Sequence, residues 1–469
     1  MKKIYFILLS LCFIIALSGC DLTLEPEGEN DIPLDEAIQT LEDVEELLLS
    51  NYAVIRSGST MGGNSNWMGS LLADQADRDP SSGFGDVQFI NIDFNAQNPT
   101  LRPFWADLYV VANRSSIAIS FIEILEGSDE AKNKLRGEAL FLRSLAHFEL
   151  VRYFALPYIK DQDNTQPGIP LRLDPVLEIE SPTAPRSSVE ATYARIIEDL
   201  LAAIDLLPSV DEDDGKPTVW AARALLAKVY FQQNNFDGAF AQANEVIQNG
   251  GFQLNETVTD IFDPEQNFSR ESIWEIPSIL LDNSSASLTG LYQSDRPFDP
   301  TYYADESFAI FARSEAADTR GQLWYNERLR NGANPPPEPV VFVSKFDNPV
   351  FNLPMLRLAE ILLIRAESAA ETNNTAVAVA DLQSVRGRAF DDSGISIDFS
   401  GTDDLINQIR EERQKEMAFE FSNIFHDLKR VGGNGESVTI GGLSFNSPEL
   451  LFKIPDVEVN TNPLVEQNP

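Results

Sequence analysis

Cys20 has the most distinctive chemistry in this 469-residue chain, which contains one other cysteine, Cys12. Two lysines and the apolar run 4–16 precede it, as in a secretory signal peptide whose core is too short to span a bilayer. The letters LSGC at 17–20 are typical of a bacterial lipoprotein signal. We expect cleavage before Cys20 and acylation of its thiol, because Cys12 leaves with the signal and no internal disulfide can form. The alternative is an ordinary signal with an incidental cysteine.

The two histidines, His147 and His426, are the first candidates for acid–base or zinc chemistry. His147 begins the letters HFELV, whereas a zinc-binding helix of the HExxH type would need a second histidine at Val151. The sequence has no nucleophile elbow, and a serine triad would have to use one of these two histidines. We therefore expect both to be core or capping residues.

Acidic residues could bind calcium or cleave glycosidic bonds. The run Asp211–Asp214 precedes Gly215, but a calcium loop with Gly215 at its sixth position would begin at Val210 and end at Ala221. We interpret the run as a solvated loop between helices. A catalytic carboxylate pair could exist among 73 acidic residues, yet no spacing places two of them together. The sequence predicts no catalytic residues, metal or cofactor.

Helices must position any site, because helical periodicity recurs along the chain and strand signals are few. We expect helices at 101–125, 136–155 and 190–207, with a proline-rich loop between the last two. The expected buried face of the helix at 136–155 consists of Ala139, Leu142, Ala146, Leu150 and Tyr153. That of the helix at 190–207 consists of Ile197, Leu200, Leu201, Ile204 and Leu207.

The segments 220–248 and 357–389 have the pattern of tetratricopeptide helix hairpins, in which small residues let two antiparallel helices approach closely. The residues that carry this pattern are Leu226, Ala227, Tyr230 and Ala239, and Ala366, Ala369, Ala378 and Leu382. Polar turns at 232–235 and 373–374 separate the helices of each pair. Because about three or more units are needed to bury a continuous core, the other helices should supply further pairs.

The remaining chain organisation follows from composition. Residues 1–19 form the signal, 20–40 an acidic tether that should stay extended, and 41–469 one folded domain. An irregular insert at about 252–354 has no helical periodicity and contains the letters ESIWEIP, which predict a short strand. Trp105, Trp220 and Trp274 lie in motifs that predict burial. The net charge of −38 repels nucleic-acid phosphates, so no nucleic-acid partner is expected.

An ordered set of motifs resembles the SusD/RagB-type nutrient-binding outer-membrane lipoproteins over essentially the whole chain. The motifs are LSGC, PFWADLYVVANRSSIAISFI, LRGEALFLRSLAHFELVRYF, ARALLAKVYFQQNNFDGAFAQANEVIQNGGFQL, SIWEI, AEILLIRAESAAE, LQSVRGRA, IREERQKEMAFEFSNIFHDLKRVGG and LLFKIPDVEVNTNPLVEQNP. One departure is visible, because the family usually has Glu-Gly-x-Arg where this chain has Glu420-Phe421-Ser422-Asn423-Ile424. We expect Arg413, Glu416, Glu420 and Arg430 to form surface ion pairs that contribute little each.

The resemblance implies a mostly α fold, with four tetratricopeptide-like helix pairs in a right-handed scaffold and a large irregular half. It implies a non-enzymatic lipoprotein on the outer face of the outer membrane, anchored only through the lipid on Cys20. Such a protein binds oligosaccharide or polysaccharide nutrients and delivers them to a SusC-type TonB-dependent barrel, which it covers as a hinged lid. Alternatives are peptide capture within the family, or a surface glycoside hydrolase or structural scaffold outside it.

A glycan site needs aromatic rings that stack on the apolar faces of sugars and planar polar groups that bind hydroxyls. Two regions offer both, and family members usually build their site from them. The first contains Trp67, Asp74, Asp77, Arg78 and Phe84, and the second contains Tyr292, Tyr302, Tyr303, Trp324, Tyr325 and Arg328. We expect Trp67, Arg78, Tyr292, Trp324 and Tyr325 to contribute as a group of exposed side chains.

Overall fold

The computed structural model describes residues 34–78, 86–175, 184–279, 281–295, 299–330 and 337–469. The chain divides into two units, one of which consists of residues Thr40–Pro469. In the other unit, helix α2 (Leu34–Ala37) lies at the end of the acidic segment. The expectation that the whole tether is extended is therefore wrong for these residues. Cys20 lies outside the described residues, and its lipidation stays a prediction.

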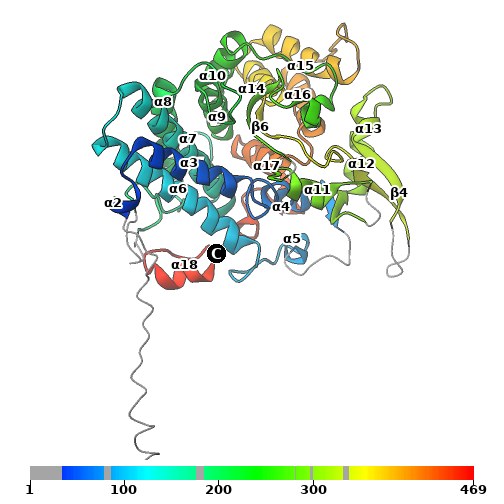
Figure 1. The fold of residues 1–469 in the computed structure, drawn as a ribbon. Coiled ribbons are helices and arrows are strands. Elements are labelled where there is room, and N and C mark those ends of the chain that lie inside the picture. Colours follow the sequence, from blue (N-terminus) through cyan, green and yellow to red (C-terminus); the bar gives the residue numbers. More distant parts are fainter. Residues whose placement is uncertain (1–33, 79–85, 176–183, 280, 296–298, 331–336) are drawn as a thin grey trace, which may run out of the picture. The chain divides into compact units, whose positions relative to one another are not determined.

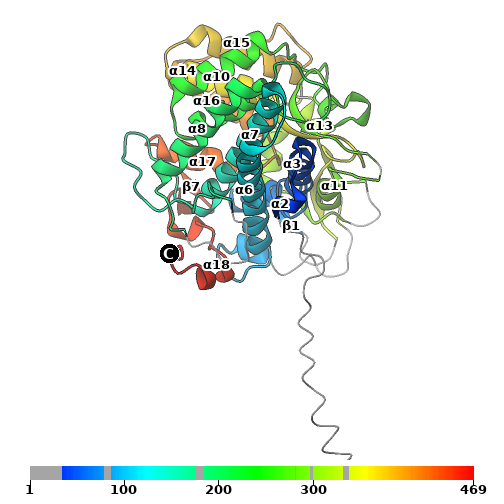
Figure 2. The same ribbon diagram turned by 60° about the vertical axis from the view of Figure 1, so that its left-hand side comes forward.

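Long helices form the scaffold of the unit Thr40–Pro469 (Figures 1 and 2). They are α3 (Leu41–Ile55), α6 (Leu101–Ile124), α7 (Asp129–Phe154), α8 (Val189–Leu206), α9 (Val219–Gln232), α10 (Phe236–Asn249), α14 (Leu358–Glu371), α15 (Thr375–Ala389) and α16 (Thr402–Glu416). Helices that follow one another pack together from α6 to α10, and α10 packs against α14 across the insert. The mostly helical architecture expected from the sequence is confirmed.

Polar side chains at the start of several helices determine where these helices begin. The Thr40 side chain accepts a hydrogen bond from Asp43 N, and the Asp43 carboxylate accepts one from Thr40 N. Ser128, Ser188 and Asn235 cap α7, α8 and α10 in a similar way. These bonds satisfy N–H groups that have no partner inside the helix. The Ser128 cap explains why α7 begins at Asp129, ahead of residue 136, where the sequence predicted the start of this helix.

Both helix hairpins that the sequence predicts are present. α9 pairs with α10 through a turn after Gln232, and α14 pairs with α15 through a turn after Glu371. A Cβ at Gly238 would lie 2.9 Å from the ring of Tyr230, so glycine permits the close approach of the first pair. The right-handed arrangement of four tetratricopeptide-like pairs stays a prediction.

Two details of the expected core are wrong. Leu201 of α8 is exposed, while the buried face of this helix includes Tyr193 and Leu200. One residue corresponds to about 100° around a helix, so Leu201 turns away from the side that packs on α7. Trp220 is only half-buried, because it lies in the first turn of α9 beside the α8–α9 loop and donates a hydrogen bond from its indole to Ser209 O at 2.9 Å. Trp105 and Trp274 are buried as expected.

The irregular half contains antiparallel strands, with one four-stranded sheet in the order β1-β3-β5-β4 and a ribbon of β2 and β6. The strands are β1 (Ala76–Arg78), β2 (Ser272–Ile276), β3 (Tyr302–Ala304), β4 (Tyr325–Leu329), β5 (Pro339–Val343), β6 (Leu353–Arg357), β7 (Thr439–Ile440) and β8 (Leu443–Ser444). Strand β2 confirms the interpretation of ESIWEIP. The insert is thus more regular than its lost helical period indicated.

Shorter helices connect the sheet to the scaffold. They are α4 (Asn64–Leu72), α5 (Val87–Ile90), α11 (Ala286–Tyr292), α12 (Glu306–Ala312), α13 (Arg320–Leu323), α17 (Asn423–Gly433) and α18 (Asp456–Thr461), with 3-10 turns η1 (Asp260–Phe262), η2 (Pro264–Gln266) and η3 (Pro448–Leu450). Helix α4 packs on both α17 and β1. It therefore joins the C-terminal part of the scaffold to the sheet.

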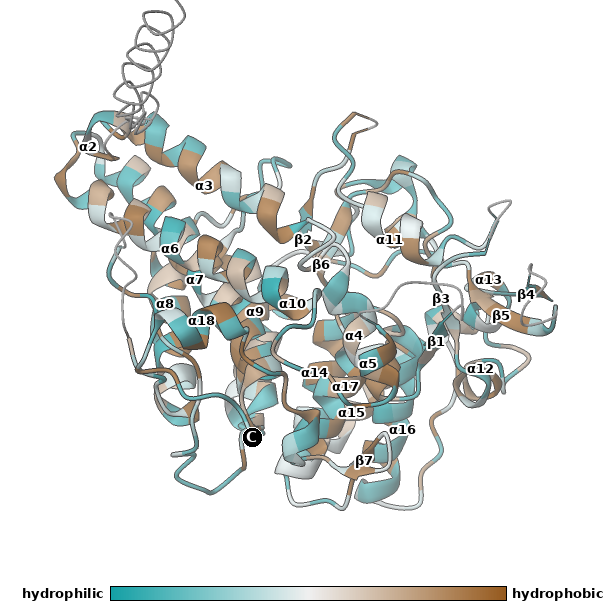
Figure 3. Ribbon diagram, turned by 90° about the horizontal axis from the view of Figure 1, so that it is seen from below, coloured by the Kyte–Doolittle hydropathy of each residue, from teal (hydrophilic) through white to brown (hydrophobic). Residues whose placement is uncertain are grey.

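Apolar side chains hold these layers together. A cluster that includes Leu362, Leu382 and Ile409 joins α14, α15 and α16. Along α3 and α6, hydrophobic and hydrophilic stretches alternate, as expected for helices that bury one face (Figure 3). No helix in the described part of the chain is long and apolar enough to cross a membrane.

The expected surface ion pairs of α16 and α17 are buried instead. The Glu416 carboxylate accepts a hydrogen bond from Arg357 Nη1 at 2.6 Å and from Arg320 Nη1 at 2.9 Å, and it also contacts Arg388. Although burial opposes ionisation, these three guanidinium groups hold the pKa of Glu416 well below its usual range. These ion pairs are buried because α16 lies between α14 and the insert.

Three other residues of this group are also paired inside the protein. Arg357 contacts Glu420 at 2.8 Å, and Arg413 contacts Glu360 at 3.0 Å. The guanidinium of Arg430 contacts Glu367 at 2.9 Å. These pairs connect the C-terminal helices to β6 and α14, so the charges link elements that lie far apart in the sequence.

Candidate functional site

The fold brings the two sequence-predicted ligand regions together. Strand β1 pairs with β3, which places Arg78 opposite Tyr302. The Trp67 ring stacks on the Tyr302 ring with a centroid distance of 5.1 Å, and the centre of the Tyr292 ring lies 5.9 Å from that of Tyr302. Residues from α4, β1, α11 and β3 therefore meet at one edge of the sheet.

The aromatic rings of this group are buried, which contradicts the expectation that they are exposed. Only 4% of Trp67 and 1% of Trp324 is exposed, and Tyr292 is fully buried. The edge of the Trp67 ring packs on Phe89, and its indole N–H donates to Asn64 Oδ1 at 3.1 Å. The reason is that the insert folds into a sheet with its own core, where large apolar rings are stabilised. Contact of these rings with a ligand stays a prediction.

Phe419 connects the remaining aromatic residues to this group. Its ring lies 5.7 Å from Tyr292 and 6.4 Å from Tyr325. Trp324 lies on the neighbouring side, where Lys345 Nζ is 4.1 Å from the centre of its ring. Phe419 has a left-handed backbone with φ of 62°, which sequence patterns did not indicate. We therefore missed the residue that joins Tyr325 to the cluster.

The charged residues of the predicted site differ in exposure. Arg78 is buried and pairs with Asp86 at 2.9 Å. Arg328 is half-buried, pairs with Asp299 at 2.7 Å and lies 4.0 Å from the centre of the Phe342 ring. Asp74 is exposed on the surface. The part of its carboxylate that is shielded from water, together with the nearby negative charge of Asp305, raises its pKa. Phe84 lies outside the described residues.

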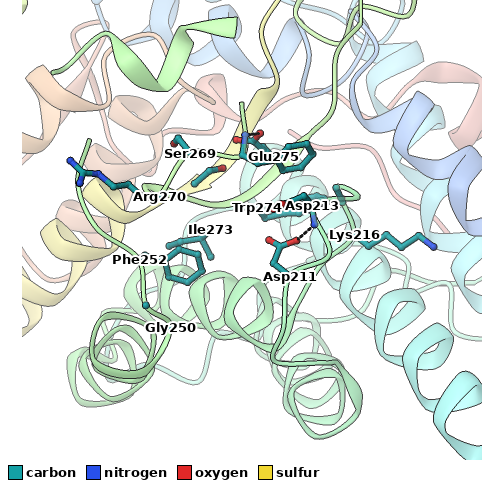
Figure 4. A pocket seen from close by; sticks show the side chains of 14 residues that line it. Asp211, Asp213, Lys216, Gly250, Phe252, Ser269, Arg270, Ile273, Trp274 and Glu275 are labelled. Atoms are coloured by element: carbon teal, nitrogen blue, oxygen red, sulfur yellow. Dashed lines mark hydrogen bonds between the residues drawn. The ribbon is translucent and has the colours of Figure 1, made fainter. Parts of the chain in front are cut away.

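A separate cavity of about 190 Å³ lies between the α8–α9 loop, the end of α10 and β2 (Figure 4). Its walls include Asp211, Phe252, Ile273, Trp274 and Glu275. Sequence analysis missed this site, because Asp211 belongs to a run interpreted only as a solvated loop and Trp274 to a motif interpreted only as core. No local pattern indicated that these segments meet.

The interior of the cavity is acidic. Partial burial raises the pKa of Asp211, and deeper burial raises the pKa of Glu275. Asp211 Oδ1 accepts a hydrogen bond from Asp213 N at 2.9 Å, which fixes the carboxylate at the wall. Lys216 and Arg270 extend away from the centre (Figure 4). Their charged ends contact Glu45 and Glu256 instead.

The two histidines are core residues, as expected. Burial and the nearby guanidinium of Arg143 lower the pKa of His147 to about 3, so its imidazole is neutral near pH 7. Burial likewise lowers the pKa of His426 well below its usual value. Among the described residues, no group of three histidine, cysteine or acidic side chains is placed to hold a metal ion.

Two protein-family models match the chain. The model described as "Starch-binding associating with outer membrane" matches residues 27–231. The model described as "SusD family" matches residues 345–469. The matched parts contain the helices from α3 to α9, the α14–α15 hairpin and the C-terminal helices, and they leave α10 and most of the insert between them.

Similar proteins occur in Bacteroides and Formosa species. A SusD-like protein of Bacteroides ovatus is 28% identical over 40% of this chain, and the match spans 34% of that protein. SusD-like protein P2 of Formosa agariphila is 25% identical over 100% of this chain and 99% of its own length. A solved SusD superfamily protein from Bacteroides vulgatus matches with a TM-score of 0.80 and 22% identity, covering 92% of this chain and 99% of that one. This last likeness concerns the fold.

Proposed function

Because this chain belongs to the SusD/RagB family, we propose that it binds oligosaccharide or polysaccharide nutrients and delivers them to a TonB-dependent outer-membrane barrel. One observation carries most of this proposal. Family models match both parts of the scaffold, residues 27–231 and 345–469, and the first is described as starch-binding and associated with the outer membrane. Carbohydrate binding in nutrient uptake is the function that this family membership implies.

The lipid on Cys20 holds the protein at the outer membrane, with the folded unit on the extracellular side. The motif LSGC at 17–20 supports the anchor. Two or three acyl chains attach a protein firmly, whereas a single chain binds a bilayer only marginally. The acidic segment after Cys20 then separates the folded unit from the membrane surface.

The protein binds its glycan without cleaving it. Both histidines are buried and neutral, so neither is suited to activate a nucleophile at the surface. A hydrolase would instead require two carboxyl groups on either side of a glycosidic bond. The proposed role is therefore capture and transfer of intact cargo.

Isothermal titration of the purified protein against a panel of neutral oligosaccharides, acidic oligosaccharides and peptides tests the ligand class. We expect saturable binding of at least one glycan, and chromatography should find that glycan unshortened after long incubation. Shortened products would indicate a hydrolase, binding of peptides alone would indicate peptide capture, and binding of neither would indicate a structural scaffold.

Co-purification in mild detergent tests the delivery step. The barrel encoded beside this protein should elute with it in a defined complex. A barrel that elutes separately at every detergent and salt concentration, while the lipoprotein still binds glycan, would contradict delivery but not glycan capture.

A further inference from the structure

We propose that the cavity between the α8–α9 loop and β2 binds one uncharged sugar ring. Its lining includes none of the ligand-binding residues that the sequence predicted. The inference rests on the proposed glycan-binding function and names where one ring of the glycan is held. Size, wall chemistry and charge each support it.

The size of the cavity suits one ring. Its volume of about 190 Å³ is slightly larger than the roughly 150 Å³ cavity known to hold benzene. It is smaller than the roughly 300–1,000 Å³ of clefts that enclose drug-sized ligands. A single six-membered ring, such as the end of a glycan chain, therefore matches the space.

One wall of the cavity is apolar. Phe252 and Ile273 lie next to each other, across the cavity from Asp211 (Figure 4). Phe252 is only half-buried, unlike Trp67 and Trp324, so part of its side chain is accessible. The apolar C–H face of a pyranose can pack against such a surface.

The base of the cavity is rigid. Trp274 is buried, and its indole N–H donates to Gly215 O at 2.8 Å. Its ring also packs against Phe141 at a centroid distance of 4.9 Å. A ligand therefore meets a preformed floor, which reduces the entropic cost of binding.

Polar groups on the other walls have unused hydrogen-bonding capacity. Ser272 is 7% exposed, and its hydroxyl lies beside the Glu275 carboxyl group, which also accepts hydrogen bonds from Phe268 N and from Asn352 Nδ2. An ionised carboxylate offers about four acceptor positions, and Asp211 uses part of this capacity for the backbone N–H groups of Asp213 and Glu212.

The charge of the cavity selects against acidic sugars. Asp211 and Glu275 line the cavity, whereas the charged ends of Lys216 and Arg270 point outward and contact Glu45 and Glu256. A uronate or sulfate group would meet carboxylates without a facing cation. The site therefore takes a neutral hexose or pentose unit.

Titration calorimetry with the full mature chain tests the inference, using a neutral oligosaccharide that binds the parent protein. Phe252→Ala should weaken binding by about fivefold or more, since loss of one ring contact corresponds to about that change in affinity. Asp211→Ala should weaken binding by about the same factor, because it removes one hydrogen-bond acceptor. Glu212→Ala is the matched control, because Glu212 is exposed in the same loop and pairs with Lys134 outside the cavity. Its affinity should equal that of the parent.

Saturation-transfer NMR with methyl glycosides supplies a second readout. Neutral methyl hexosides should show transfer that Asp211→Ala reduces, while methyl uronides should show none at this site. Unchanged affinity in both variants, with parent-like thermal unfolding, would overturn the cavity as a binding site but leave glycan capture intact. If no glycan of the panel binds the parent protein, both the cavity inference and the proposed function are wrong.

Discussion

Trp324 fills the interior of the insert, where its ring contacts Lys345 and Phe262. Trp324→Ala should lower the free energy of unfolding by about 3–5 kcal/mol, because it leaves a cavity among buried side chains. Urea unfolding measures this loss. Trp324→Phe should cost much less, because it keeps most of the apolar volume. A Trp324→Ala protein as stable as the parent but impaired in glycan binding would instead make this ring a ligand contact.

Glu138 makes stability depend on pH. Its Oε1 accepts a hydrogen bond from the Tyr52 hydroxyl at 2.7 Å, and burial raises its pKa from 4.5 to about 7. The folded state therefore holds this proton more tightly than the unfolded state does. The resulting contribution to stability is full below pH 4.5 and is lost as pH rises through about 7.

Glu138→Gln isolates this effect, because glutamine keeps an acceptor for Tyr52 but does not titrate. The free energy of unfolding of the variant minus that of the parent should increase as pH rises from about 4.5 to 7. Urea unfolding at several pH values measures the difference. A difference that stays constant over this range would show that Glu138 does not titrate as its burial indicates.

The contact between α4 and α17 depends on a glycine. Gly69 N donates to Ser422 Oγ at 2.8 Å, and a Cβ at this position would lie 2.7 Å from Phe425 Cβ. Gly69→Ala should therefore destabilise the protein by about 1–3 kcal/mol through overpacking. Gly290→Ala in α11 is the matched control, because no atom lies within 4 Å of its Cβ. It should be neutral or stabilising by about 0.5–1 kcal/mol, as measured by urea unfolding.

The buried carboxylate of Glu416 leads to a prediction about the stability that α16 contributes. Glu416→Ala leaves Arg357, Arg320 and Arg388 without their shared carboxylate, and breaking a buried ion pair costs about 3–5 kcal/mol. Glu411→Ala on the same helix removes an exposed carboxylate and should change stability by no more than about 0.5 kcal/mol. Equal thermal unfolding temperatures for the two variants would contradict a structural role for the buried network.

At the scale of the whole molecule, we predict that Cys20 determines where the protein resides. Cys20→Ala should move the protein from the membrane fraction to the soluble fraction in cells that lack the barrel, because no lipid can then be attached. Immunoblotting of separated fractions measures the distribution. A Ser18→Ala variant keeps the cysteine and should remain with membranes. Persistent membrane association of Cys20→Ala without the barrel would show that another feature anchors the chain.

Much of the architecture followed from local patterns. Small residues at helical spacing predicted the α9–α10 and α14–α15 hairpins, and the letters ESIWEIP predicted β2, because periodicity records which side of an element is buried. The ordered motifs from LSGC to the C-terminus were enough to identify the family. These features depend on residues close together in the chain, so they could be interpreted without the fold.

Other features depended on contacts between distant segments, and local patterns do not record those. Arg413, Glu416, Glu420 and Arg430 have the composition of a surface helix, yet packing against α14, β6 and the insert buries them. Trp67 and Trp324 occur among turn residues, yet pairing of β1 with β3 and folding of the insert enclose their rings. The cavity beside Trp274 arises where the α8–α9 loop, the end of α10 and β2 meet. Sequence alone determined the family and the helical hairpins, whereas tertiary structure decided which side chains remain accessible, because accessibility is set by what packs from elsewhere in the chain.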